Sequence, residues 1–213
     1  MFAKRRYMIS ILSLALFGLL GTAGSAAAQP FPPVRIVDAE YAGSGCPQGT
    51  ARVALHSDTL SIFPEQYLAV TAPGRPTVRK SCNVAVVLRV PPGYSIALFA
   101  TTYRGFAEIP QGGMGRLHGE FFWAGQTGPR HTHYFPPGTS GNWTVIEPAG
   151  AKRWSRCGGD VIARANTNVV ARKEAPFSPF EAQVQVDTVD IYAGVEYQFV
   201  ARPCRPGLPA DSR

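Results

Sequence analysis

The sequence predicts an all-β protein: an antiparallel β-sandwich, immunoglobulin-like or jelly-roll-like, that carries two disulfides. Two observations predict this fold class. Apolar and polar residues alternate with a period of two along most of the chain, as they do on strands with one buried face. Gly, Pro and Asn turns interrupt the alternation about every ten residues, and with 22 Gly and 19 Pro no window shows a sustained helical stripe. Two packed sheets bury one face of many such strands.

The first predicted strands lie in the N-terminal half of the chain. Residues 29–34 (QPFPPV) are expected to be an extended lead-in. Residues 51–63 (ARVALHSDTLSIF) predict two short strands around a turn at Ser57 and Asp58. A strand at 82–90 follows, then a PPGY turn, then a long strand at 95–109.

The later strands show the alternation most clearly. In residues 116–123, Leu117, Phe121 and Trp123 share one face, and His118 and Glu120 share the other. Further strands are expected at 142–147, 160–172, 181–189 and 195–201, and a surface loop at 171–182.

The two ends of the chain predict a leader and a tail. A basic start (MFAKRRY), an apolar run and a small-residue A-x-A ending have the layout of a secretory signal peptide, so residues 1–28 are expected to be removed by cleavage after Ala28. The apolar run is shorter than the roughly 20 residues that span a bilayer. We therefore expect a secreted or periplasmic protein without a transmembrane anchor after cleavage. Residues 29–204 are expected to form a single domain and residues 205–213 a flexible tail.

All four cysteines lie in the expected mature chain, and export places them in an oxidising compartment where disulfides persist. Three connectivities are possible. We favour Cys46–Cys82 and Cys157–Cys204, since each closes a loop within its own half of the chain, and each closure would stabilise the fold by about 4 kcal/mol. The first bond would pin the glycine-rich residues 42–50 to the sheet. An even count argues against a free catalytic thiol.

The distribution of charge points away from nucleic acid as a partner. The formal charge of +7 includes three basic residues of the leader, so the mature chain is only mildly basic. Its cations are spread along the chain, whereas a nucleic-acid binder gathers them on one face or stripe. The exception is AKRWSR, in which Lys152, Arg153, Trp154 and Arg156 place a ring among cations. This run is either a solvated loop or a binding loop for acidic or sugar-bearing surface polymers.

Several short motifs resemble, in order and spacing, those of a family of exported proteins, domain of unknown function family 4360. They are GSGCPQGTA, RKSCNVAVVLRVPPGYS, YRGFAEIPQGGMGRLHGEFFWAG, RWSRCG and YQFVARPC, and the resemblance covers about residues 38–204. It implies an exported, disulfide-bonded β-protein with its four cysteines at the family's cysteine positions. It implies no chemistry, since the family has no established activity. The PRHTHYFPPG segment departs from the family, and the closing motif is less basic than the usual form.

A pair of histidines is the main candidate for a metal site. His131 and His133 would share a face on a strand, and with Gly125 they match the opening of a cupin metal motif, G-x5-H-x-H. Pro137 and Gly138 stand where that motif places its glutamate.

Side chains from a neighbouring strand, His118 and Glu120, would have to complete such a site. The alternative is an exposed loop between Pro129 and Pro136 that carries two histidines. We expect no metal and no cofactor, because two histidines without their carboxylate form an incomplete ligand set.

The sequence assigns no catalytic residue. It contains no G-x-S-x-G, no H-E-x-x-H and no phosphate-cradling glycine loop. We expect a secreted, non-enzymatic interaction or envelope-associated module, and the alternative is a secreted enzyme, either cupin-like and metal-dependent or a hydrolase. Tyr103, Trp143 and Trp154 lie by predicted turns, where they are either exposed for stacking or cap the ends of the sandwich.

Overall fold

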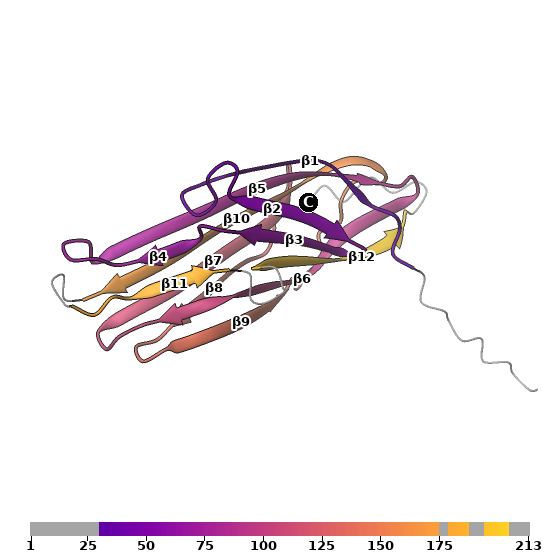
Figure 1. Ribbon diagram of the computed structural model, residues 1–213. Coiled ribbons are helices and arrows are strands. Elements are labelled where there is room, and N and C mark those ends of the chain that lie inside the picture. Colours follow the sequence, from indigo (N-terminus) through magenta and orange to yellow (C-terminus); the bar gives the residue numbers. More distant parts are fainter. Residues whose placement is uncertain (1–29, 175–178, 188–193, 205–213) are drawn as a thin grey trace, which may run out of the picture. The chain divides into compact units, whose positions relative to one another are not determined.

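Within the residues that the structure describes, 30–174, 179–187 and 194–204, twelve strands form two antiparallel sheets packed face to face (Figure 1). The structure is a computed structural model, in which the described residues from Phe31 onward belong to one compact unit. The prediction of an all-β sandwich is confirmed. The predicted signal peptide (1–28) and tail (205–213) lie outside the described residues, so both remain predictions.

The first sheet has five strands. Their order across the sheet is β1 (Arg35–Ala42), β5 (Thr77–Val90), β10 (Gly159–Lys173), β7 (Gly113–Trp123) and β8 (Arg130–Phe135). The two edge strands, β1 and β8, come from opposite ends of this order, and each pairs with one long inner strand.

The second sheet has seven strands and is built around β6. Its order is β2 (Ala51–His56), β3 (Thr59–Pro64), β12 (Val195–Pro203), β6 (Tyr94–Glu108), β11 (Gln183–Val186) and β4 (Leu68–Val70). The last strand, β9 (Ser140–Pro148), also pairs with β6. Because β9 overlaps both β12 and β11 in register, it occupies the other edge of β6.

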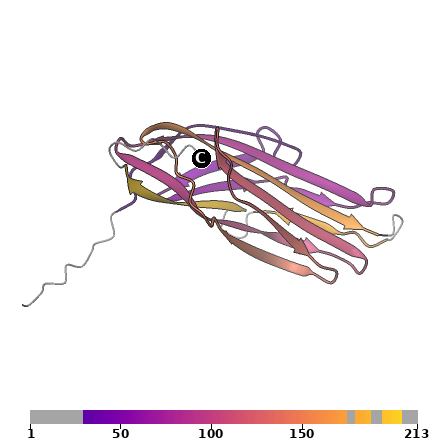
Figure 2. The same cartoon turned by 180° about the vertical axis from the view of Figure 1, so that it is seen from behind.

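Strict alternation builds the core between the sheets, which are seen from behind in Figure 2. Every second residue of β7 is buried, as the sequence predicted for Leu117, Phe121 and Trp123. Phe121 packs on Tyr197 from the other sheet at 5.3 Å between ring centroids, and Trp123 packs on Phe199 at 5.9 Å. Burial of these rings contributes to the attraction between the two sheets.

Both predicted disulfides are present. Cys46 and Cys82 have their Cα atoms 5.2 Å apart, and Cys157 and Cys204 have theirs 6.0 Å apart. Both distances lie within the usual range for a disulfide.

Two strands were not predicted from the sequence: β1, which lies between the expected lead-in and the glycine-rich segment, and β4, which is three residues long. For the histidine segment, β8 bears out the strand alternative and rules out the exposed loop. The predicted hairpin at Ser57 and Asp58 is confirmed, with Ser57 in the left-handed region at φ 53°. None of the described residues forms a helix long and apolar enough to cross a membrane.

Candidate functional site

The predicted binding loop lies in the connection between β9 and β10, residues 149–158, here called the Cys157 segment. Its main chain runs beside the first half of β6 as if it prolonged β9. The Ala149 amide donates to the Phe99 carbonyl at 2.9 Å, and the Ser155 amide donates to the Ile96 carbonyl at 2.8 Å. An isolated bridge joins Trp154 to Ala97. These bonds give the loop the order of a sheet edge.

Side chains from both sheets reinforce this position. The buried Ser155 hydroxyl accepts from the Ile96 amide at 3.1 Å and donates to the Arg156 carbonyl at 3.0 Å. From the first sheet, the Trp123 indole donates to the Arg153 carbonyl at 2.9 Å, and just beyond that strand the Gln126 amide donates to the Trp154 carbonyl at 3.2 Å. The Cys157–Cys204 disulfide closes the end of the segment.

Two cation–π pairs arrange the side chains of the segment. The Arg202 guanidinium of β12 lies 4.1 Å from the Trp154 ring centroid. Arg202 and Trp154 come from opposite edges of β6, so this pair crosses the outer face of that strand. The Lys152 ammonium lies 5.6 Å from the ring centroid of Phe99, whose exposed fraction is 48%. Both rings therefore hold a cation in place.

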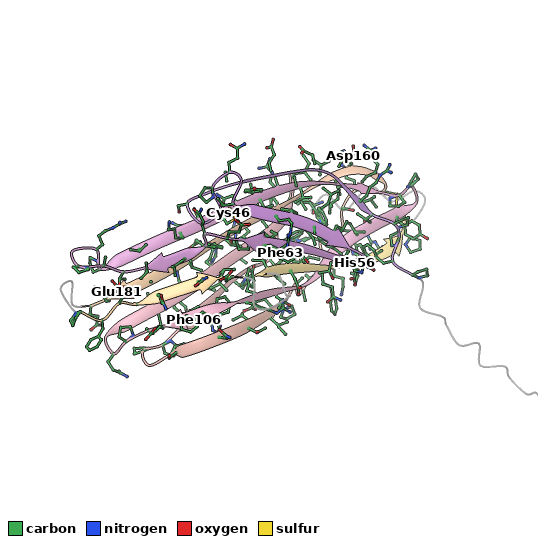
Figure 3. All side chains as sticks on the ribbon, in the orientation of Figure 1. Cys46, His56, Phe63, Phe106, Asp160 and Glu181 are labelled. Atoms are coloured by element: carbon green, nitrogen blue, oxygen red, sulfur yellow. A yellow bond between two sulfur atoms is a disulfide. The ribbon has the colours of Figure 1, made fainter. Side chains whose placement is uncertain are left out.

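The result is a cationic patch, defined here by Phe99, Lys152, Arg153, Trp154, Arg156 and Arg202. Lys152, Arg153, Arg156 and Arg202 are exposed. Arg156 donates to the main-chain carbonyl of Asp160 at 3.3 Å, while the carboxylate of that aspartate pairs with Arg89 at 2.6 Å. This pairing lowers the pKa of Asp160 through the hydrogen bond from Arg89. Asp160 lies at the rim of the first sheet (Figure 3).

The structure brings together all four residues predicted for the binding loop, and it adds two that the sequence did not point to. Phe99 lies mid-strand in the sequence pattern, and no local feature marks its exposure. Arg202 had a usable signal, because it stands two residues before Cys204 and the favoured disulfide brings that end beside Trp154. Of the other two rings by predicted turns, Tyr103 is fully buried, so the exposed alternative does not hold for it, and Trp143 packs on Phe135.

The histidine candidate does not assemble as a metal site. His131 and His133 share a face of β8, as predicted, with His131 opposite Gly119 and His133 opposite Leu117. His118 and Glu120 lie on the other face of β7, and their partners are the Thr132 hydroxyl at 2.9 Å and Arg130 at 2.7 Å. They cannot complete a site with His131 and His133.

The described part of the chain contains no group of three or more His, Cys, Asp or Glu side chains able to hold a metal ion. Trp143, at the neighbouring edge strand β9, and Phe135 fill the space next to His133 instead. The expectation that the purified protein carries no metal remains a prediction.

His131 belongs instead to a buried polar cluster. Its ring lies 4.9 Å from that of Tyr103, and a Cβ atom on Gly119 would stand 2.2 Å from the Tyr103 hydroxyl and 2.6 Å from His131 Nε2. The hydroxyls of Tyr103 and Tyr197 and the Nε2 atom of His131 are buried and form no hydrogen bond with the described residues. Burial, with a smaller contribution from His118, lowers the pKa of His131 from 6.5 to about 4.

The buried tyrosines show the same effect of desolvation. Burial raises the pKa of Tyr67, Tyr103 and Tyr197, even though the Tyr67 hydroxyl donates to Thr167 at 2.8 Å. Neutral phenols and a neutral imidazole are therefore the forms that the interior favours. Exposed cations are consequently a stronger basis for ligand binding than this enclosed cluster.

Comparison with known proteins agrees with this exported, disulfide-bonded β-sandwich. Residues 32–204 match the model of a family described as a domain of unknown function, DUF4360. A protein of Arthroderma benhamiae, described as an uncharacterized secreted protein, is 30% identical over 143 residues, which cover 64% of this chain and 58% of the relative. The chain thus spans less than two thirds of the relative's length. Its predicted export is confirmed by the secreted relative together with the two disulfides, and the chain belongs to the DUF4360 family.

Proposed function

We propose that this exported β-sandwich is a non-enzymatic binding module whose cationic patch holds an acidic polysaccharide of a cell surface or envelope. The observation that carries the proposal is the array of four exposed cations: Lys152, Arg153 and Arg156 on the Cys157 segment, which main-chain bonds anchor to β6, and Arg202 of β12, which lies over Trp154. Charged groups already held in place lose little conformational entropy when a polyanion binds.

The roles of the two rings follow from the contacts. Arg202 covers one face of Trp154, and Lys152 lies over Phe99, so the rings position cations and offer less area for stacking a sugar. Recognition then depends mainly on charge. Contacts between exposed charges are screened by salt, with a Debye length of about 10 Å at 0.1 M. Binding is therefore expected to weaken steeply as salt rises.

The test uses immobilised polygalacturonate as the acidic polysaccharide and dextran as its neutral counterpart. The wild-type protein is expected to bind polygalacturonate at about 0.02 M salt and to lose it at about 0.5 M, and to show no affinity for dextran through the patch. Each patch cation changed to glutamine should weaken binding about threefold, as expected for an exposed charge pair. Arg202→Gln and a Lys152→Gln/Arg153→Gln double variant are the informative changes.

Arg52→Gln is the matched control. Its guanidinium lies 4.5 Å from the Phe63 ring centroid on β2 and β3, so the change removes the same charge and the same kind of pair away from the patch. Weakening by Arg52→Gln equal to that by Arg202→Gln would show that net charge alone is responsible. Equal binding to duplex DNA of the same charge density would overturn the choice of polysaccharide.

Trp154 gives a second control on the role of the ring. Trp154→Phe keeps an aromatic face for Arg202, whereas Trp154→Ala removes it. If the ring acts by positioning Arg202, the phenylalanine variant retains more binding than the alanine variant, and Trp154→Ala adds little to Arg202→Gln. Additive losses would instead indicate that the ring touches the ligand itself.

A further inference from the structure

A groove of about 630 Å³ lies on the outer face of the first sheet, over β1, β5 and β10. Its residues come from these three strands and from the glycine-rich connection between β1 and β2, residues 43–50, here called the Cys46 segment. Cys46 itself lies in that connection (Figure 3). The groove shares no residue with the cationic patch, which lies on the second sheet and its connections.

The strand register explains why the surface is hollow there. In one row across the sheet, Glu40 of β1, Ala85 of β5 and Arg164 of β10 are neighbours. A small methyl group thus lies between two long side chains, and it leaves an open floor. In the next row, Asn83 and Asn166 lie side by side, so two amides border the same floor.

The wall formed by the Cys46 segment is held rigidly. The Tyr41 hydroxyl accepts from the Gly49 amide at 3.1 Å, and the Gly45 amide donates to the Ser81 carbonyl at 2.8 Å. Gly43 has a φ of 142°, and a Cβ atom there would stand 2.2 Å from the Ser81 carbonyl oxygen, so only glycine permits this approach. The Cys46–Cys82 disulfide completes the attachment one residue before Asn83. The segment therefore presents Gln48 to the groove in a fixed place.

The polar groups of the groove are available to a ligand. Within the described residues, no side-chain hydrogen bond or ion pair involves the groove's five longer polar side chains, namely those of Glu40, Gln48, Asn83, Arg164 and Asn166. They are exposed or half-buried. Small-ligand sites are concave and direct a small number of polar groups at the ligand, and the volume of this groove lies within the range of about 300–1,000 Å³ for such sites.

The chemistry of the lining indicates the ligand. One carboxylate and one guanidinium balance in charge, so the groove selects neither anions nor cations. Three carboxamides supply donors and acceptors together, which matches hydroxyl groups, since these also donate and accept. We propose that this groove binds a neutral sugar unit of a glycan chain, as a second site distinct from the cationic patch.

The experiment titrates the full-length exported protein, labelled with ¹⁵N, with neutral hexasaccharides. The probes are β-1,4-linked glucose, mannose, xylose and N-acetylglucosamine, and β-1,3-linked glucose. At least one is expected to give saturable shifts of the side-chain amide signals of Asn83, Asn166 and Gln48. Raising the salt should leave that affinity within about twofold, since no net charge is neutralised.

Variants then locate the site. An Asn83→Ala/Asn166→Ala double variant removes one exposed and one half-buried amide without breaking an internal hydrogen bond, and it should weaken binding about tenfold or more. Asn142→Ala on β9 removes an exposed amide from the other sheet and should have no effect. Near-identical thermal unfolding of both variants and the wild type checks that the fold is intact.

Two outcomes would overturn the proposal. One is the absence of saturable shifts at the groove with every hexasaccharide at millimolar concentration. The other is binding that Asn142→Ala weakens as much as the groove variant does. Polygalacturonate binding separates this site from the proposed function, because Arg202→Gln should affect only the acidic polymer and the asparagine changes only the neutral sugar.

Discussion

The Cys46 segment and the Cys157 segment are both short irregular connections closed by a disulfide, yet the surroundings of the two bonds differ. Cys46 is 0% exposed and Cys82 is 3% exposed, and both belong to the core. Cys157 is exposed and Cys204 only half-buried, at the margin of the sandwich. The first bond packs as a core side chain as well as a cross-link, whereas the second acts mainly as a cross-link. The Cys46–Cys82 disulfide thus lies beside the charge-balanced groove, and the Cys157–Cys204 disulfide lies beside the cationic patch.

Removal of each disulfide should give the largest loss in the free energy of unfolding, and the two losses should differ. The sequence separations of 36 and 47 residues are similar, so loop closure contributes about 4 kcal/mol in both cases. Cys46→Ala/Cys82→Ala should cost a further amount of about 1 to 2 kcal/mol, because it also leaves a cavity in the core. Urea unfolding of both double variants measures the difference. Equal losses would show that burial of Cys46–Cys82 adds nothing to the cross-link.

Glycine substitution in each segment should give the next largest effect. A Cβ atom on Gly45 would lie 2.2 Å from the ring of Tyr67, which is 2% exposed and cannot move aside. Gly45→Ala is therefore expected to cost about 2 to 3 kcal/mol. Gly158 has a φ of 62° and meets Pro92 only at 3.2 Å, so Gly158→Ala should cost about 1 kcal/mol. A reversed order in thermal unfolding would contradict the contrast between a core-packed and a marginal segment.

Acid should lower the free energy of unfolding through β8. This strand is held by strand pairing and packing alone, whereas a disulfide closes each of the two segments. Burial lowers the pKa of His131 to about 4, so the unfolded chain binds a proton below about pH 6.5 and the folded chain does not until about pH 4. The contribution of the neutral ring to stability is complete above pH 6.5 and is lost as the pH falls toward 4. Because the ring is partly exposed, the loss is expected to be about 1 to 2 kcal/mol.

The measurement for this prediction is the free energy of unfolding between pH 7 and pH 4. His131→Leu should flatten the dependence relative to the wild type, whereas His133→Leu, two residues along the same strand, should retain the His131 contribution. An unchanged slope in His131→Leu would mean that other groups account for the acid sensitivity.

The smallest expected difference in stability is that between the loss of one serine hydroxyl in each segment. The Ser155 hydroxyl is buried and bonds to Ile96 and Arg156, so Ser155→Ala should cost about 1 to 1.5 kcal/mol. The Ser44 hydroxyl is exposed and accepts from the Ser81 amide at 3.2 Å, so Ser44→Ala should cost about 0.5 kcal/mol or less. Amide hydrogen exchange at Ile96 and Ser81 reports each loss directly. A larger increase in exchange rate over the wild type at Ser81 in Ser44→Ala than at Ile96 in Ser155→Ala would contradict this order.

Long inner strands were predictable because burial of one face imposes a period of two on their residues. β5, β7 and β12 follow that rule, and the faces predicted for Leu117 and His118 are those observed. β1 and β8 are edge strands, and prolines border both. The alternation of β1 is broken by a register shift between Ile36 and Asp38, and β8 is only six residues long. β4 is too short to show a period. Such strands depend on a partner that is distant in sequence, and no local pattern carries that information.

The residues of the candidate site also fall into two groups, those that a local sequence pattern predicted and those that only the tertiary structure brings together. Lys152, Arg153, Trp154 and Arg156 were predicted because a local run shows a ring among cations. Arg202 joins them only through pairing of β12 with β6 and through the disulfide. The groove over Ala85 could not be predicted, because its hollow arises from the register that sets a small side chain between Glu40 and Arg164.

By itself, the sequence determined the fold class, because alternation and turn residues are local properties. It favoured one of three disulfide connectivities, and the structure contains that one. The alternation of the sequence placed His118 and Glu120 on one face, and for His131 and His133 it left open a strand on which they share a face and an exposed loop. Only the tertiary structure decided that these two faces are opposite, through pairing of His131 with Gly119. Cross-strand register joins residues with no fixed relation along the chain, and a shift of one residue would have turned every side chain of β8 to the other face.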